Sequence, residues 1–144
     1  MSTSQPADTS NVASVLRVAT TRTMRQLRAV GARRITLTQL SAMASIKAAG
    51  ELTLGELAAR ERVQPPSMTR VITTLHDHGL VDRKTDPSDG RQVLVQLTDK
   101  GRQILEDEAR TREAWLADQI RDLTEQEKQT LVEASEILMR LIGE

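Results

Sequence analysis

Apolar residues recur three and four positions apart over most of the first 80 residues, which is the spacing of amphipathic helices. Leu40, Met43 and Ile46 form the inner side of one such helix. The pattern predicts four helices in this part of the chain, over residues 11–30, 38–49, 53–61 and 64–78. Glycines at positions 31, 50 and 79 follow three of them, and glycine is the usual residue just past a helix end.

Capping residues stand at several of the expected helix starts. Thr53 and Glu56 form a capping box, in which the hydroxyl and the carboxylate each accept a backbone N–H of the first turn. The run Gln-Pro-Pro at 64–66 suits the start of the fourth helix, because proline has no N–H to leave unpaired in the first turn. Ser10 or Asn11 is expected to cap the first helix.

The hydrophobic period changes from helical to alternating after residue 79. A short strand is predicted over 80–84, and a returning strand over 92–97 has its apolar residues on one face. That face holds Val93, Val95 and Leu97. The segment 86–90 between the strands, Asp-Pro-Ser-Asp-Gly, is dense in turn-forming residues. The pattern therefore predicts a β-hairpin with a polar tip.

The last third of the chain returns to helical spacing. Thr98 is expected to cap a long helix that ends near Arg121, and a second capping box, Thr124 with Glu127, starts the last helix. These helices carry more apolar surface than a small hairpin can cover, in Trp115, Leu116, Ile120, Leu123, Leu131, Leu138 and Leu141. We expect the same surface of a second copy to cover it about a two-fold axis. The alternative is a helical subdomain of a monomer.

Length and composition fit one domain and exclude several functional classes. The chain has 144 residues, and Trp115 is its only Phe, Trp or Tyr, too few for the stacking platforms that bind single-stranded nucleic acid. The absence of cysteine excludes disulfides, thiolate nucleophiles and cysteine zinc sites. No apolar run approaches the ~20 residues of a membrane span. Residues 1–10 are polar and have no secretory signal, so we expect a disordered tail there and a cytoplasmic protein without a membrane partner.

The net charge is zero, but the charges are unevenly distributed. Residues 1–100 hold fourteen Lys and Arg against nine Asp and Glu, whereas residues 101–144 hold six against eleven. Residues 11–34 carry six arginines and no acid. Such asymmetry indicates an anionic partner for the first part of the chain, with a solvated helix face as the alternative.

Two short helices followed by a β-hairpin are the layout of a winged helix-turn-helix. In this motif the second helix of the pair enters the major groove of double-stranded DNA. Its apolar residues, such as Met68 and Ile72, are predicted to face inward, while polar residues that can bind bases or phosphates face outward. The candidate DNA-binding residues are Gln64, Pro65, Pro66, Ser67, Thr69, Arg70, Thr73 and Thr74. The alternative is a polar face that only meets solvent, and the hairpin that follows argues against it.

The hairpin adds three candidate DNA contacts. Arg91 lies at the tip, from where an arginine can enter the minor groove. Its neighbour Asp89 is expected to hold the tip, through an Asx-type hydrogen bond or an arginine pair. Arg83 and Lys84, near the base, suit phosphate contacts or an intramolecular salt bridge equally well.

Several segments together resemble the MarR family of bacterial transcription regulators. They are Ile35-Thr36-Leu37-Thr38-Gln39-Leu40, Leu54-x-x-Leu57-Ala58, Pro66-Ser67-Met68-Thr69-Arg70 and Leu75-x-x-x-Gly79-Leu80-Val81-x-Arg83. The most specific match is the wing signature, Asp86-Pro87-x-Asp89-x-Arg91 followed by Leu97-Thr98-x-x-Gly101. The resemblance runs from about residue 11 to the end. Gln64 departs from the family, which often has a Ser or Thr cap there.

The resemblance implies a mainly α fold with a two-stranded β wing, in an intertwined homodimer. It divides the chain into a DNA-binding lobe over 37–100 and dimerisation helices over 11–34 and 101–144. Members of the family usually repress by occupying a pseudo-palindromic operator. Many release DNA when a small phenolic or anionic molecule binds between the two parts. By similarity Arg91 is the wing arginine, and Ser67, Thr69 and Arg70 read bases or clamp phosphates.

An effector site, if the chain has one, is expected between the first, second and fifth helices. Its candidate lining residues are Arg17, Arg22, Arg25, Met43 and Trp115. The arginines would hold a carboxylate or phenolate. The alternative is that they pair with the acidic C-terminal helices of a partner subunit.

Other chemistry-bearing residues give structural interpretations. His76 and His78 are two apart, so they point in different directions on a helix, and too few ligands accompany them for zinc. The acidic run 106–108 is expected on a helix surface. No phosphate-binding loop or catalytic triad is present. We therefore expect no metal, no cofactor and no enzymatic activity. The rival to DNA binding is a winged-helix module that binds other proteins.

Overall fold

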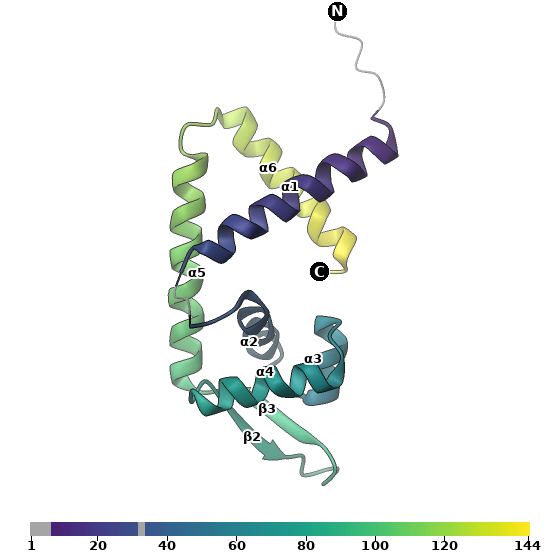
Figure 1. Cartoon of the computed structure of the whole chain (residues 1–144), viewed down its shortest axis with the longest axis vertical. Coiled ribbons are helices and arrows are strands. Elements are labelled where there is room, and N and C mark those ends of the chain that lie inside the picture. Colours follow the sequence, from purple (N-terminus) through teal and green to yellow (C-terminus); the bar gives the residue numbers. More distant parts are fainter. Residues whose placement is uncertain (1–6, 32–33) are drawn as a thin grey trace, which may run out of the picture.

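The computed structural model describes residues 7–31 and 34–144 of the chain. Within them, six helices and three strands follow the order that the hydrophobic pattern predicts, with one added strand (Figure 1). The elements are α1 (Thr9–Ala29), α2 (Leu37–Ala49), β1 (Glu51–Thr53), α3 (Leu54–Glu61), α4 (Pro65–Asp77), β2 (Val81–Thr85), β3 (Val93–Leu97), α5 (Asp99–Ile120) and α6 (Glu125–Ile142). The fold is thus mainly α with a small antiparallel wing, as predicted.

Side-chain caps fix the starts of the helices. The two predicted capping boxes are confirmed: Glu56 N donates to Thr53 Oγ1 at 3.1 Å, and Glu127 N donates to Thr124 Oγ1 at 3.2 Å. A third box, at the start of α2, was not predicted. It joins Thr36 and Gln39, where Gln39 N donates to Thr36 Oγ1 at 3.1 Å. These reciprocal bonds satisfy amides that a helix leaves unpaired at its first turn.

The first helix begins earlier than its pattern predicts. Helix α1 starts at Thr9, so Thr9 and Ser10 belong to the helix and not to a tail. The predicted cap, Ser10 or Asn11, is wrong: the cap position is Asp8, whose side chain makes no capping bond. Residues 7 and 8 precede the helix, while residues 1–6 of the predicted tail and residues 32–33 of the predicted dimerisation segment lie outside the described residues.

The sheet has three strands in the order β1-β3-β2, not the two of the predicted hairpin. Strand β2 pairs with β3 antiparallel, with Val81 opposite Leu97 and Thr85 opposite Val93. Strand β1 pairs with the other edge of β3, where Leu52 lies opposite Val95. The short β1 thus covers an edge of the wing and joins it to α2 and α3.

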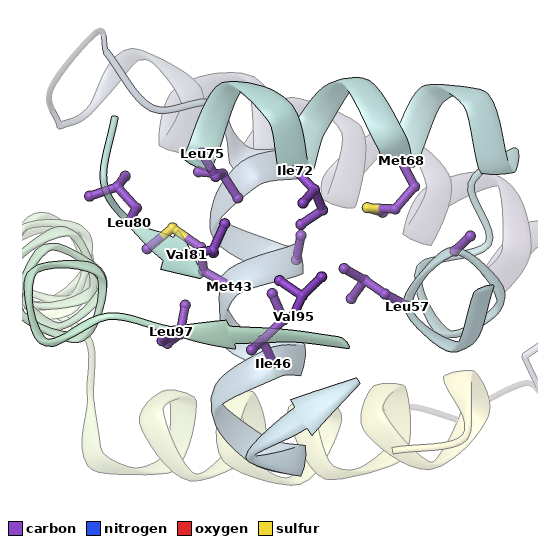
Figure 2. Packing of buried hydrophobic residues seen from close by; sticks show 12 residues of the cluster. Met43, Ile46, Leu57, Met68, Ile72, Leu75, Leu80, Val81, Val95 and Leu97 are labelled. Carbon is purple, nitrogen blue, oxygen red and sulfur yellow. The ribbon is translucent and has the colours of Figure 1, made fainter. Parts of the chain in front are cut away.

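One hydrophobic core holds the helix-turn-helix and the wing together (Figure 2). The fully buried side chains of α4 face those of α2, α3 and β3. The largest are Met43, Ile46, Leu57, Met68, Ile72, Leu75, Val81 and Val95. Burying each stabilises the fold by roughly 1.5–3 kcal/mol relative to exposure. Because three of them belong to α4, the rotation of that helix about its axis is fixed.

The helices at the two ends of the chain are packed differently. Neither α1 nor α6 has a buried residue among those described, although both carry large apolar side chains. In Figure 1 helix α5 runs from the winged lobe, which consists of α2 to β3, to the end of the molecule where α6 turns back. The exposed apolar residues there are Val12, Val15, Met24, Ile120, Leu131, Val132, Ile137, Met139, Leu141 and Ile142. This apolar surface lies outside the winged lobe.

Candidate nucleic-acid interface

Helix α4 divides into a buried and an exposed face. Met68, Ile72 and Leu75 are buried in the core, as predicted. Residues that follow the helical repeat on the opposite side, among them Arg70 and Thr74, are exposed. Gln64, Pro65, Pro66 and Thr69 are exposed as well, whereas Ser67 and Thr73 are half-buried. The predicted DNA-reading residues therefore share one accessible surface, which we call the α4 face.

The side chain at the cap position of α4 does not cap the helix. Gln64 occupies the cap position but its side chain makes no capping bond, and its carbonyl accepts from Ser67 N at 2.9 Å and Met68 N at 3.1 Å. Pro65 and Pro66 have no N–H, so two of the amides that normally need a cap are absent. The amide group of Gln64 is thus available to a partner at the end of the α4 face.

The turn before α4 is held by its neighbours. Arg62 adopts a left-handed backbone with φ 52°, and its N–H closes the end of α3 on the carbonyls of Ala58 and Ala59. The carboxylate of Glu61 accepts the hydroxyl of Ser41 at 2.7 Å and also that of Ser45. These bonds tie the end of α3 to α2 and so hold the residue that precedes the turn in place.

The acidic residues of the wing tip accept hydrogen bonds from other residues of the tip. Asp89 Oδ1 accepts Arg91 N at 3.1 Å, which is the Asx-type bond predicted for it. Asp86 Oδ1 accepts both the hydroxyl and the N–H of Ser88, and these bonds hold the pKa of Asp86 below its ordinary value. The guanidinium of Arg91 makes no hydrogen bond or ion pair with another described residue. A free cation therefore stands at a tip that the two carboxylates stabilise.

The two basic residues of β2 have partners within the chain. Lys84 Nζ lies 2.8 Å from Glu51 Oε2 of β1, an exposed pair that contributes little to stability. Arg83 Nη2 lies 3.3 Å from Nδ1 of His76, on α4. Of the two interpretations left open by the sequence, the intramolecular salt bridge is confirmed for Lys84. His76 packs next to the wing, and His78 Nδ1 lies 2.7 Å from the carbonyl of Thr74.

A cavity of about 340 Å³ lies between α1, α2 and α5, where the effector site was expected. Its lining is mostly apolar and ends in one guanidinium: Met24, Leu37, Leu40, Ser41, Ala44, Leu105, Ala109 and Arg112. None of the predicted lining residues contributes. Met43 is fully buried in the lobe core, and Trp115 is half-buried on α5. Arg17 and Arg22 are exposed on α1, and Arg25 borders a separate hollow on α1.

The prediction of a solvent-exposed acidic run at 106–108 is wrong for Glu108. Only 8% of this residue is exposed, and its Oε2 accepts Arg112 Nη1 at 2.5 Å. Arg112 Nε in turn donates to the carbonyl of Leu27 at 3.3 Å. This buried pair joins α5 to the end of α1 at the edge of the cavity. The spacing of four residues between Glu108 and Arg112 is the signal in the sequence for an ion pair on one helix face, but this spacing does not reveal that the pair is buried.

Residues 7–31 and 34–144 contain no group of three or more His, Cys, Asp or Glu side chains able to hold a metal ion. In the same part of the chain, no helix combines the length and the apolarity that crossing a membrane requires.

Comparison with known proteins identifies the family. The family model described as "MarR family" matches residues 35–93. HTH-type transcriptional regulator MT0903.1 of Mycobacterium tuberculosis is 42% identical over 134 residues, which cover 92% of this chain and 94% of the relative. HTH-type transcriptional repressor MdtR of Bacillus subtilis is 32% identical over 107 residues, covering 74% and 67%.

Solved structures agree with this result. A mutant of MarR from E. coli superposes with a TM-score of 0.77 and 25% identity, covering 89% of this chain and 96% of the other. The same mutant complexed with operator DNA gives a TM-score of 0.68 at 25% identity, covering 92% and 99%. The chain belongs to the MarR family of helix-turn-helix transcription regulators.

Proposed function

We propose that this DNA-binding regulator acts as a homodimeric repressor of a pseudo-palindromic operator. The observation that carries the proposal is the combination of the α4 face with the free guanidinium of Arg91 at the wing tip. The core fixes α4 with its polar side outward, and β3 connects the same core to the wing. A helix for the major groove and an arginine for the adjacent minor groove are what a winged helix needs to bind a half-site.

Homodimerisation is supported by the apolar surface of α1 and α6. Side chains such as Val15 and Leu141 are 61% and 69% exposed, and such patches on a soluble chain mark interaction surfaces. A second copy is the simplest partner, since a two-fold interface uses the same patch on both subunits. The dimer then presents two α4 helices to half-sites about one helical turn, ~10 bp, apart.

The residue roles within this proposal follow from exposure and charge. Gln64, Ser67, Thr69, Arg70 and Thr73 read base edges or phosphates in the major groove, with Pro65 and Pro66 at the approach. Arg83 and Lys84 contact phosphates from the wing base once their internal partners are exchanged for DNA. Arg91 enters the minor groove.

Repression is supported by the relatives. MdtR of Bacillus subtilis is named a transcriptional repressor, and a mutant of MarR from E. coli was solved in complex with operator DNA. The role requires access to the chromosome, so a cytoplasmic location belongs to the proposal.

A small effector is proposed for the cavity between α1, α2 and α5. Its apolar lining suits an aromatic or aliphatic body, and Arg112 supplies one cation for a carboxylate or phenolate. Because Arg112 also binds Glu108 and the carbonyl of Leu27, an anion that engages it competes with the contact between α5 and α1. Arg25 on α1 remains a secondary candidate.

Selection of bound genomic fragments with purified protein tests the proposal. Enrichment of an inverted repeat with half-sites one turn apart, and an affinity that falls steeply with salt, would support it. A folded dimer that enriches no sequence would contradict it, and would favour the alternative, a winged-helix module that binds proteins. Transcription from the enriched promoter in vitro then decides between repression and activation.

A further inference from the structure

The three threonines of the α4 face share one local geometry, which Thr20 and Thr111 also adopt on other helices. Thr69 Oγ1 donates to the carbonyl of Pro65 at 3.0 Å, Thr73 Oγ1 donates to that of Thr69 at 2.9 Å, and Thr74 Oγ1 donates to that of Arg70 at 3.1 Å. In each case the hydroxyl turns back onto the carbonyl four residues earlier, one helical turn below. The proton of each hydroxyl is thus used inside the helix.

This geometry determines what the threonines offer to a partner. With its proton engaged, each side chain presents its γ-methyl group and the lone pairs of its oxygen. It can pack against an apolar group or accept a hydrogen bond, but it donates one only by breaking the bond to its own helix. An acceptor edge, such as N7 and O6 of guanine, is therefore a poor match for these side chains.

In the major groove, one base carries a methyl group: thymine, at its C5 position. Resting on the function proposed above, we infer that the methyl groups of Thr69 and Thr73 read thymine methyl groups in each operator half-site. The two residues lie one turn apart on the same side of α4. Their β-carbons are about 6 Å apart, and bases two steps apart are separated by roughly 6.8 Å. Thymines within about two steps of each other are thus within reach.

Arg70 stands between the two threonines and complements them. It is exposed at the middle of the α4 face, and its guanidinium makes no hydrogen bond or ion pair with another described residue. It supplies the donors that the threonines lack, for guanine or for a phosphate. Specificity for thymine is therefore assigned to the methyl groups of Thr69 and Thr73, not to the charge of Arg70.

The test compares operators that differ only in the thymine methyl group. The probe is a synthetic duplex with the inverted repeat that the protein enriches from a random-sequence library, made with thymine or with uracil in the half-sites. The expected loss on replacing one contacted thymine in each half-site is about 15-fold in Kd. This is fourfold per half-site, the ratio that corresponds to the ~0.8 kcal/mol of one buried methyl group. Single-position replacements locate the contacted thymines.

Matched variants assign the effect to its residues. Thr69→Ser and Thr73→Ser keep the hydroxyl and lose the methyl, so each is expected to lower the thymine-to-uracil ratio, whereas Thr69→Val keeps the methyl and the ratio. Thr111→Ser on α5 is the control, because Thr111 has the same backbone-directed hydroxyl, bonded to Asp107 at 2.9 Å, away from α4. The ratio is internal to each variant, so a change in the folded fraction cancels.

The outcomes separate this inference from the function on which it rests. Tight binding of the enriched operator with equal affinity for its uracil form would overturn the inference and leave the regulator function intact. The inference would also be overturned if the thymine-to-uracil ratio persisted in the double variant that carries both Thr69→Ser and Thr73→Ser. If no duplex is enriched at all, the proposed function and the inference both fail.

Discussion

Gly101 is the position where one added methyl group is expected to do most damage to the winged lobe. It is buried in the first turn of α5, against the turn that joins α4 to β2. A Cβ there would lie 2.0 Å from the carbonyl oxygen of Leu80 and 3.0 Å from its carbon. The backbone at this point is fixed, because Thr98 N donates to the same oxygen at 3.1 Å and Thr98 Oγ1 donates to the carbonyl of Gly79 at 2.7 Å.

The size of the effect follows from these distances. Relief of the contact in Gly101→Ala requires a shift of about 1.4 Å, from 2.0 Å to the 3.4 Å at which ordinary contact begins, and the atom that must move is backbone. Overpacking of this kind costs ~1–3 kcal/mol, and the upper end applies where no flexible side chain can give way. Alanine regains ~1 kcal/mol of helix propensity over glycine. The net loss is about 2 kcal/mol, or a Tm lower by about 7 °C for a chain of 144 residues.

Thermal unfolding followed by circular dichroism measures this difference, at equal protein concentrations because the stability of a dimer depends on concentration. Gly55→Ala is the matched control. It lies in α3, has an ordinary negative φ, and its Cβ would meet nothing closer than Thr53 Oγ1 at 4.0 Å. Its Tm is expected to stay the same or rise. Equal Tm values for the two variants would refute the conclusion that α5 and the Leu80 carbonyl must approach this closely.

Three further outcomes concern the wing. Arg91→Ala is expected to weaken operator binding about tenfold without lowering the Tm, because the guanidinium has no partner within the described chain; unchanged binding in a gel shift would contradict the wing assignment. Glu51→Gln frees Lys84 and should steepen the plot of the logarithm of the binding constant for DNA against the logarithm of the salt concentration. Glu106→Gln frees Lys47, which lies away from the wing, and should leave the slope unchanged. Equal slopes for the two variants would argue against a phosphate contact by Lys84. The lowered pKa of Asp86 means that its bonds are complete above the ordinary aspartate pKa and are lost as pH falls through the lowered folded value. The protection of the wing-tip amides, measured as exchange relative to the intrinsic rate at each pH, should fall in that acid window, and Asp86→Asn should reduce this pH dependence of the protection.

The helices and the hairpin could be predicted because their signals are local. Capping boxes at Thr53 and Thr124, glycines after helix ends, and the alternation of 92–97 each lie within a few residues of the feature that they determine. The α4 face was predictable for the same reason. Once Met68, Ile72 and Leu75 are assigned to the core, the helical period leaves one side for a partner.

Features that depend on distant neighbours could not be predicted. Strand β1 has only three residues, and it is a strand because it pairs with β3, some 43 positions away. The pattern correctly predicted that Met43 faces inward. Its side chain lies in the hydrophobic core of the winged lobe, however, and does not line the cavity between α1, α2 and α5. Burial of Glu108 depends on where α1 ends, next to Arg112 and the carbonyl of Leu27, which no spacing within α5 encodes.

The zero net charge of the chain is compatible with DNA binding because of how the charges are used. In the winged lobe several carboxylates are engaged locally: Asp86 and Asp89 accept wing-tip amides, and Glu61 accepts two serine hydroxyls. The guanidinium groups of Arg70 and Arg91 have no such partner among the described residues. The acidic surplus belongs to residues 101–144, none of which is part of α4 or of the wing strands. In the proposed complex, phosphates on α4 and the wing meet the guanidinium groups of Arg70 and Arg91, and this local distribution of charge, not the total charge, governs binding.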